Sequence, residues 1–178
     1  MQGRTDVPLA ASGIEALKES IHELDGSRLG AIWTGPDEAS IATADQIAQT
    51  TGGVVTSTPD LAEIDLGLWE GMLVSEMVSR FPRACKAWMD DPSLINPPGG
   101  ETLAEAHDRL TAGVGRIIDR ARSGAAIAFV LRPIAMGMVR CWLAEEPTCN
   151  IWGEAKDAAW SRWFDVQARV LTRPASVR

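Results

Sequence analysis

The sequence predicts an α/β domain in three layers, with a mostly parallel sheet and helices on both of its faces. Short apolar runs that fit buried strands alternate with longer stretches whose apolar residues recur every three or four positions. Glycine and proline separate most of these segments, as is typical at the ends of helices and strands. Because alternating strands and helices favour a parallel sheet, we expect a single domain of this kind over residues 1–178.

The first half of the chain carries two predicted helices and two predicted strands. Ser12 and Glu15 have the spacing of a capping box, which predicts a helix that ends at Gly26. Residues 30–33 fit a short buried strand, and a second helical stripe follows over residues 41–48. Residues 54–56 fit a second strand, after which we expect a long loop.

The second half is predicted to add three helices and a strand. Residues 72–81 have apolar side chains at helical spacing, and Pro82 closes that pattern. A second capping box, Thr102 to Glu105, predicts the start of a long helix. Residues 125–131 form a continuous apolar run that fits a fully buried strand, and Pro133 suits the first turn of the next helix.

Composition excludes several classes of function. The net charge of −7 and the lack of a Lys/Arg block argue against nucleic-acid binding. The longest apolar run has seven residues, far fewer than the ~20 of a membrane span. No leader pattern opens the chain and three unclustered cysteines do not indicate disulfides, so we expect a cytoplasmic protein. His22 and His107 fall in predicted helices, and neither a metal site nor a cofactor is predicted.

Five segments carry motif-like sequences in a fixed order: 2–13, 32–44, 61–71, 97–109 and 129–133. The first contains QGRTDVPL, the third reads LAEIDLGLWEG, and the fourth begins PPGGE. In this order the segments resemble the histidine phosphatase (phosphoglycerate mutase-like) superfamily. Its members carry QGxxDxPL, SSPxxRA, LxExxxGxWEG, PPGGES and SHG motifs at these places. The resemblance implies the superfamily's three-layer fold with a mostly parallel sheet.

The resemblance also implies a phosphoryl-transfer chemistry. A histidine in an opening RHG motif takes the phosphoryl group, two arginines and a second histidine hold its oxygens, and a carboxylic acid protonates the leaving oxygen. Such a reaction needs a neutral imidazole nucleophile inside a cationic pocket, because negative charge is spread over the transferring group.

The sequence departs from that pattern at most of these positions. The RHG strand would precede Gln2, so we expect the fold to lack its first strand. The second arginine position falls on Ala39, and the closing histidine position falls on Arg132. Glu63 alone matches, in the position of the acid. The resemblance therefore implies Glu63 as the retained catalytic position, and Arg132 and Thr34 as a remnant phosphate pocket.

Three functions remain open at this point. The favoured one is a non-catalytic member (a pseudoenzyme) with a binding, regulatory or assembly role, since losing one electrostatic donor alone costs ~10²–10³ in rate. The second is an active phosphatase or mutase whose recorded chain starts late. The third is different chemistry, with Glu63 as acid/base and Arg132 holding an anion. Glu63 could also simply pair with Arg132.

The positions at which the sequence departs from the family's motifs also predict binding partners. A remnant phosphate pocket suits a small anion or a phosphate-containing ligand. A missing strand would leave unpaired backbone groups on its neighbours, which invite strand pairing. The alternating residues 164–170 could supply that strand, and Trp152, Trp160 and Trp163 suit an interface. We therefore expect a homodimer or a complex with another protein.

Overall fold

The computed structural model describes residues 2–94, 96–147, 151 and 164. Within them, three parallel strands form one sheet in the order β2-β1-β3. The strands are β1 (Ala31–Thr34), β2 (Val54–Ser57) and β3 (Ile127–Val130). In the central strand, Ala31 lies opposite Val54 on one side and Ile127 on the other. The predicted parallel sheet is confirmed.

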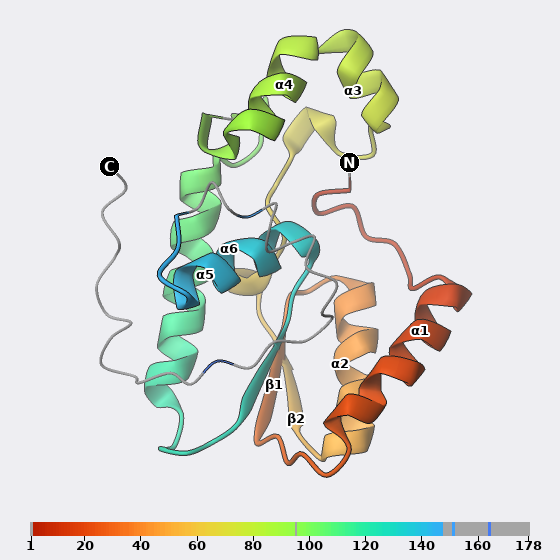
Figure 1. Ribbon diagram of the computed structural model, residues 1–178, viewed down its shortest axis with the longest axis vertical. Coiled ribbons are helices and arrows are strands. Elements are labelled where there is room, and N and C mark those ends of the chain that lie inside the picture. The colour runs from red at the N-terminus through yellow and green to blue at the C-terminus, as the bar shows by residue number, and fades with distance from the viewer. Residues whose placement is uncertain (1, 95, 148–150, 152–163, 165–178) are drawn as a thin grey trace.

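Helices cover both faces of this sheet, which confirms the predicted three layers. They are α1 (Ala11–Ile21), α2 (Glu38–Thr51), α3 (Val74–Arg80), α4 (Pro82–Asp90), α5 (Leu103–Arg120) and α6 (Pro133–Leu143). Helices α1 and α2 lie on one face, and α5 and α6 lie on the other (Figure 1). Helices α3 and α4 lie beyond the end of the sheet, at the same end of the molecule as the N-terminal segment (Figure 1). No helix within the described ranges is long and apolar enough to cross a lipid bilayer.

Two apolar clusters form the core, one on each side of the sheet. The smaller cluster includes Ile32 of β1 and Ala44 of α2, which are both fully buried. The larger one includes Leu110 and Val114 of α5, and Trp33 of β1 packs against it. Successive side chains of a strand point to opposite faces, so β1 contributes to both clusters and holds the layers together.

Two details of the predicted helices are wrong. Helix α1 begins at Ala11 with extended Ala10 as its N-cap and no side-chain cap, so Ser12 lies inside the first turn and cannot form a capping box. Pro82 closes one helix as predicted, but it also opens α4, which the sequence prediction omits. Proline lacks the N–H that a first helical turn leaves unpaired, so it serves both purposes.

Strand β3 is less buried than predicted. All four of its residues are partly exposed, although the continuous apolar run predicts a fully buried strand. The reason is its position: among the described residues β3 pairs with β1 alone and lies at one edge of the sheet. The predicted strand over 164–170 and the three tryptophans near it lie outside the described residues, apart from Phe164.

Candidate functional site

A pocket of about 400 Å³ opens at the carboxyl end of the sheet. Its polar wall consists of Gln2, Gly3, Glu63 and Arg132. Its apolar wall consists of Leu66, Val74, Met77, Cys85, Trp88, Met89, Pro133 and Ile134. The pocket therefore brings together two of the three predicted site residues, Glu63 and Arg132, and places them against helices α3 and α4. A second, more open groove of about 580 Å³ lies at the opposite end of the sheet, along residues 26–29 and 49–52, and holds none of them.

Arg132 lies between the end of β3 and the first turn of α6, and it is only 9% exposed. Its Nη2 donates to the side-chain oxygen of Gln2 at 2.8 Å, and its Nη1 donates to the backbone oxygen of Thr5 at 3.3 Å. The carboxylate of Asp37 lies 3.7 Å from Nη1. Asp37 is itself fixed as the N-cap of α2, where it accepts from the backbone N–H of Ser40. Arg132 thus ties the N-terminal segment to the sheet.

Further polar contacts fasten the N-terminal segment across this end of the sheet. The backbone N–H of Arg4 donates to Glu70 at 2.7 Å, and the Arg4 side chain forms ion pairs with Glu101 at 2.9 Å and Asp65 at 3.4 Å. Asp6 accepts from the first backbone N–H of α2. These contacts give the QGRTD motif a structural role: they hold its first two residues, Gln2 and Gly3, in the wall of the pocket.

Glu63 lies deeper, at 4% exposure, and its carboxylate accepts three backbone hydrogen bonds. The donors are Ile64 at 2.8 Å, Ile134 at 2.9 Å and Ala135 at 2.8 Å. Because the last two N–H groups belong to the first turn of α6, Glu63 caps that helix from another part of the chain. Burial raises the pKa of Glu63, and these hydrogen bonds and the charge of Arg132 oppose the rise.

The simple pairing of Glu63 with Arg132 is wrong. Among the described residues, the charged group within ion-pair distance of Arg132 is Asp37. Arg132 acts on Glu63 through space, where it lowers the pKa of the carboxyl group. The hydrogen-bond partners of Glu63 are backbone N–H groups, which cannot be identified from a sequence pattern.

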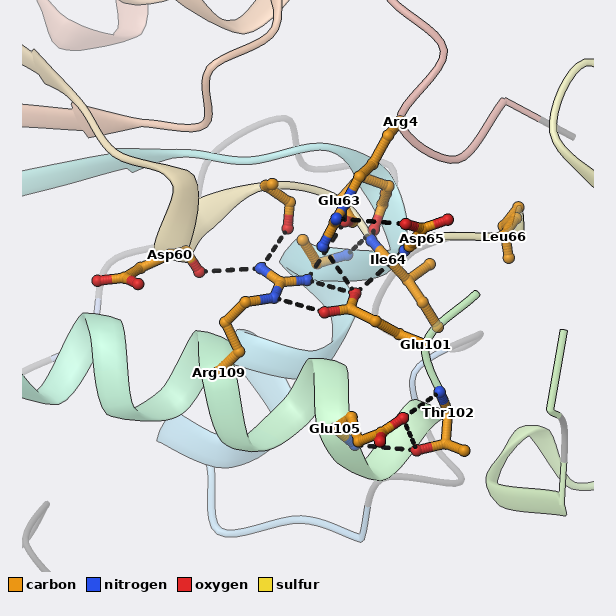
Figure 2. A network of polar contacts seen from close by, with 12 residues as sticks. Arg4, Asp60, Glu63, Ile64, Asp65, Leu66, Glu101, Thr102, Glu105 and Arg109 are labelled. Atoms are coloured by element: carbon orange, nitrogen blue, oxygen red, sulfur yellow. Dashed lines mark hydrogen bonds and ion pairs between the residues drawn. The ribbon is translucent and has the colours of Figure 1, made fainter. Parts of the chain in front are cut away.

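A network around Arg109 positions the loop that carries Glu63 (Figure 2). Arg109 of α5 donates through Nε and Nη2 to both carboxylate oxygens of Glu101, each at 2.8 Å. It also donates to the backbone oxygens of Asp60, Ala62 and Glu63, at 3.0, 2.9 and 3.3 Å. Burial opposes ionisation of Glu101, but its contacts with Arg109 and other donors hold its pKa below the ordinary value. One guanidinium thus fixes the path of three residues leading to the site.

The capping box predicted at Thr102 is confirmed beside this network (Figure 2). The side chain of Glu105 accepts from the backbone N–H of Thr102 at 2.9 Å, and the Thr102 hydroxyl accepts from the backbone N–H of Glu105 at 3.2 Å. This contact fixes the start of α5 directly after Glu101, so the PPGGE motif both leads into the helix and supplies the partner of Arg109.

The sequence matches the histidine phosphatase superfamily (branch 1) over residues 1–168. The chain belongs to this superfamily. Phosphoserine phosphatase 1 of Hydrogenobacter thermophilus is 27% identical over 158 residues, which cover 89% of this chain and 74% of that protein. The bifunctional protein Rv2228c of Mycobacterium tuberculosis is 34% identical over 90 residues, which cover 51% of this chain and 24% of that protein.

Solved structures agree with this fold. YhfR of Bacillus stearothermophilus superposes with a TM-score of 0.78 at 26% identity, over 85% of this chain and 75% of that one. The α-ribazole phosphatase of Shigella flexneri superposes with a TM-score of 0.72 at 19% identity, over 86% and 75% of the two chains. The second likeness is one of fold alone. The phosphoglycerate mutase-like architecture implied by the sequence motifs is confirmed.

The remaining residues at histidine phosphatase positions lie outside the pocket. Thr34 ends β1, is fully buried, and its hydroxyl has no hydrogen-bond partner among the described residues. Ala39 lies in the first turn of α2. Both histidines of the chain are described: His22 is exposed on a short turn after α1, and His107 is buried on α5 beside Asp108. Neither histidine lines the pocket.

A metal site finds no support in the described part of the chain, where no three His, Cys, Asp or Glu side chains gather closely enough to hold an ion. The carboxylates near the pocket already have partners within the protein. Asp37 caps a helix, and Glu101 binds Arg109.

Proposed function

We propose that this histidine phosphatase superfamily member binds a phosphate-type anion at Arg132 without transferring a phosphoryl group. The observation that carries the proposal is Arg132 itself, a buried guanidinium that lines the pocket at the position matching the family's closing histidine. The side-chain oxygen of Gln2 lies 2.8 Å from Nη2. Arginine offers the same N–H donors to phosphate and carboxylate oxygens, so an anion can take the place of this exposed amide.

Phosphoryl transfer by the family route lacks support in the residues of this chain. The two histidines lie outside the pocket, so no imidazole is placed to attack. Ala39 brings no charge where the family has its second arginine, and Asp37 places a carboxylate 3.7 Å from Arg132. Because phosphoryl transfer depends on several aligned cationic groups, one partly neutralised guanidinium would stabilise the transition state weakly.

The catalytic half of the proposal is tested with p-nitrophenyl phosphate and phosphoserine. We expect no turnover above the buffer rate, with phosphoserine phosphatase 1 of H. thermophilus as the positive control. Arg132→His is not expected to restore activity, because it adds a supporting imidazole and no nucleophile. Turnover by the purified chain that Glu63→Ala abolishes would contradict the proposal and favour an active enzyme.

The binding half is tested in the same preparations by calorimetric titration with sulfate, which keeps its charge across the working pH range. We expect Arg132→Met to weaken sulfate binding about tenfold or more, since a hydrogen bond to a charged group contributes about 1.5–3 kcal/mol. Arg28→Met is the matched control, because Arg28 lines the second groove, at the other end of the sheet. Equal losses in the two variants would show that sulfate binds without a defined site.

We also propose that two copies of the chain associate through the edge of the sheet at β3. Among the described residues this strand has one neighbour, and its four apolar residues are partly exposed. Exposed strand edges favour pairing with another chain. Sedimentation velocity at micromolar concentration is expected to give a dimer, and Phe129→Lys is expected to shift it toward monomer. A wild-type chain that sediments as a monomer would contradict this proposal.

A further inference from the structure

We propose that the ligand of this pocket is an organic phosphate whose phosphate group is bonded to an apolar group of several carbons. The phosphate lies at Arg132, and the apolar group packs against α3 and α4. This inference rests on the proposed function, because it assumes that an anion binds at Arg132. It goes further by assigning the class of molecule that carries the anion.

The two ends of the pocket differ in chemistry. The polar groups of Gln2, Glu63 and Arg132 line one end, where an anion would bind. The rest of the lining is apolar and comes largely from α3, α4 and the start of α6. Inorganic phosphate, or the phosphate of a small hydroxylated metabolite, would leave that apolar wall in contact with water. A volume of about 400 Å³ also exceeds the needs of a bare anion and falls in the usual range of small-molecule sites, roughly 300–1,000 Å³.

The apolar wall has a buried part and an exposed part. Leu66, Met77 and Trp88 are almost completely buried and form its base. Val74 of α3 and Met89 of α4 are 64% and 58% exposed, although they line the same pocket. A bound apolar group would cover these two side chains, and burying apolar surface is favourable by about 25 cal/mol per Å². The ligand would thus remove from water the side chains that α3 and α4 leave uncovered.

Charge restricts the ligand further. The guanidinium of Arg132 is the cationic group in the pocket lining. The amide of Gln2 can donate a further hydrogen bond to an anion, whereas the Glu63 carboxylate already accepts three backbone N–H groups and adds no positive charge. A fully apolar ligand would leave these polar groups buried with fewer partners, which is costly. A molecule with one anionic end and one apolar end satisfies both walls.

The probe for this inference is octyl phosphate, used below the concentration at which it forms micelles. Inorganic phosphate and 1-octanol are the two comparison ligands, and binding is measured by calorimetry. We expect octyl phosphate to bind at least ~100-fold more tightly than inorganic phosphate, since each buried methylene contributes roughly fourfold in affinity. We expect 1-octanol to bind at least about tenfold more weakly than octyl phosphate, because it lacks the charge that Arg132 recognises.

Cys85 provides an independent readout of where the probe binds. It is a free thiol in the lining of the pocket, whereas Cys141 is buried in the core. Octyl phosphate is expected to slow alkylation of Cys85 by iodoacetamide, with the modified residue located by mass spectrometry. Met89→Gln is expected to weaken octyl phosphate binding by about tenfold. Leu94→Gln is the matched control, because Leu94 is also an exposed apolar side chain, at 73% against 58% for Met89, and lies outside the pocket lining.

The outcomes separate this inference from the proposed function. If inorganic phosphate binds in an Arg132-dependent manner and octyl phosphate binds no more tightly, the inference is overturned and the proposed function stands. If neither phosphate binds, both are overturned. If 1-octanol binds as tightly as octyl phosphate, or if Arg132→Met leaves octyl phosphate binding unchanged, the anionic end plays no part and the inference is again overturned.

Discussion

Replacing Arg109 with alanine is expected to lower the free energy of unfolding by about 3 kcal/mol. The substitution removes both hydrogen bonds to Glu101 and the donors to the backbone oxygens of Asp60, Ala62 and Glu63. A half-buried carboxylate and three carbonyl groups then lose a partner at once. Chemical denaturation followed by circular dichroism measures the difference directly.

Arg116→Ala is the matched control for this prediction. Arg116 lies on the same helix, two turns further on, and forms an ion pair with the side chain of Asp60 at 2.6 Å. Its side chain is 50% exposed, however, whereas that of Arg109 is 20% exposed. Exposed ion pairs contribute about 0–1 kcal/mol, so the control is expected to change stability little. A loss at Arg109 no larger than the loss at Arg116 would contradict the role given to the network.

A double substitution tests whether Arg109 and Glu101 act as a pair. Removing the arginine alone takes away the positive charge that faces the partly buried Glu101 carboxylate. The single variant therefore includes the cost of a partly buried charge that has lost its main partner. Removing both side chains eliminates that cost. The double variant Arg109→Ala, Glu101→Ala is therefore expected to lose clearly less stability than the sum of the two single variants. Additive losses would mean that the two residues stabilise the fold independently.

Local sequence signals predicted the architecture well, because several elements are bounded by residues with strong backbone preferences. Gly52 adopts a left-handed conformation directly after α2, and Thr102 caps α5 as its spacing with Glu105 indicates. The first capping box was wrong because Ser12 and Glu15 have the correct spacing but the N-cap is Ala10, two residues earlier. Spacing alone does not determine which residue takes the extended conformation of an N-cap.

The site was predicted less completely, because its contacts join segments far apart in the sequence. The motifs indicated Glu63 and Arg132, and both line the pocket. The roles of Arg4 and Arg109 were missed, although both lie inside quoted motifs, since most of their partners lie more than 40 residues away in the sequence. The role of Asp37 as an N-cap could have been predicted from the sequence, because an aspartate directly before a helix is a common N-cap. Its second contact, with Arg132, depends on the tertiary fold.

Replacing Glu63 with alanine is the second substitution for which we expect a large effect, a loss of about 3 kcal/mol in the free energy of unfolding. The substitution leaves the N–H groups of Ile64, Ile134 and Ala135 without their acceptor in a buried position. Glu76→Ala is the matched control, because Glu76 accepts one N–H at the start of α3 on an exposed surface. That change is expected to cost about 0.5–1 kcal/mol, as exposed caps do. Equal losses would contradict the proposal that Glu63 fixes the start of α6.

The pH dependence of stability distinguishes the charge of Glu63 from its shape. Burial raises the pKa of Glu63 in the folded chain above the ordinary value of 4.5, which applies to the unfolded chain. At a pH between these two values, the folded chain holds a proton that the unfolded chain has released. Stability linked to this group is therefore complete below pH 4.5 and is lost as the pH rises through the raised pKa.

Glutamine is neutral at every pH and resembles the protonated acid. We expect the wild-type chain to lose stability relative to Glu63→Gln as the pH rises from 4 to 8, measured by urea denaturation at each pH. A difference between the two proteins that stays constant over this range, or that changes in the opposite direction, would mean that the three N–H donors and Arg132 outweigh burial and keep the carboxylate charged.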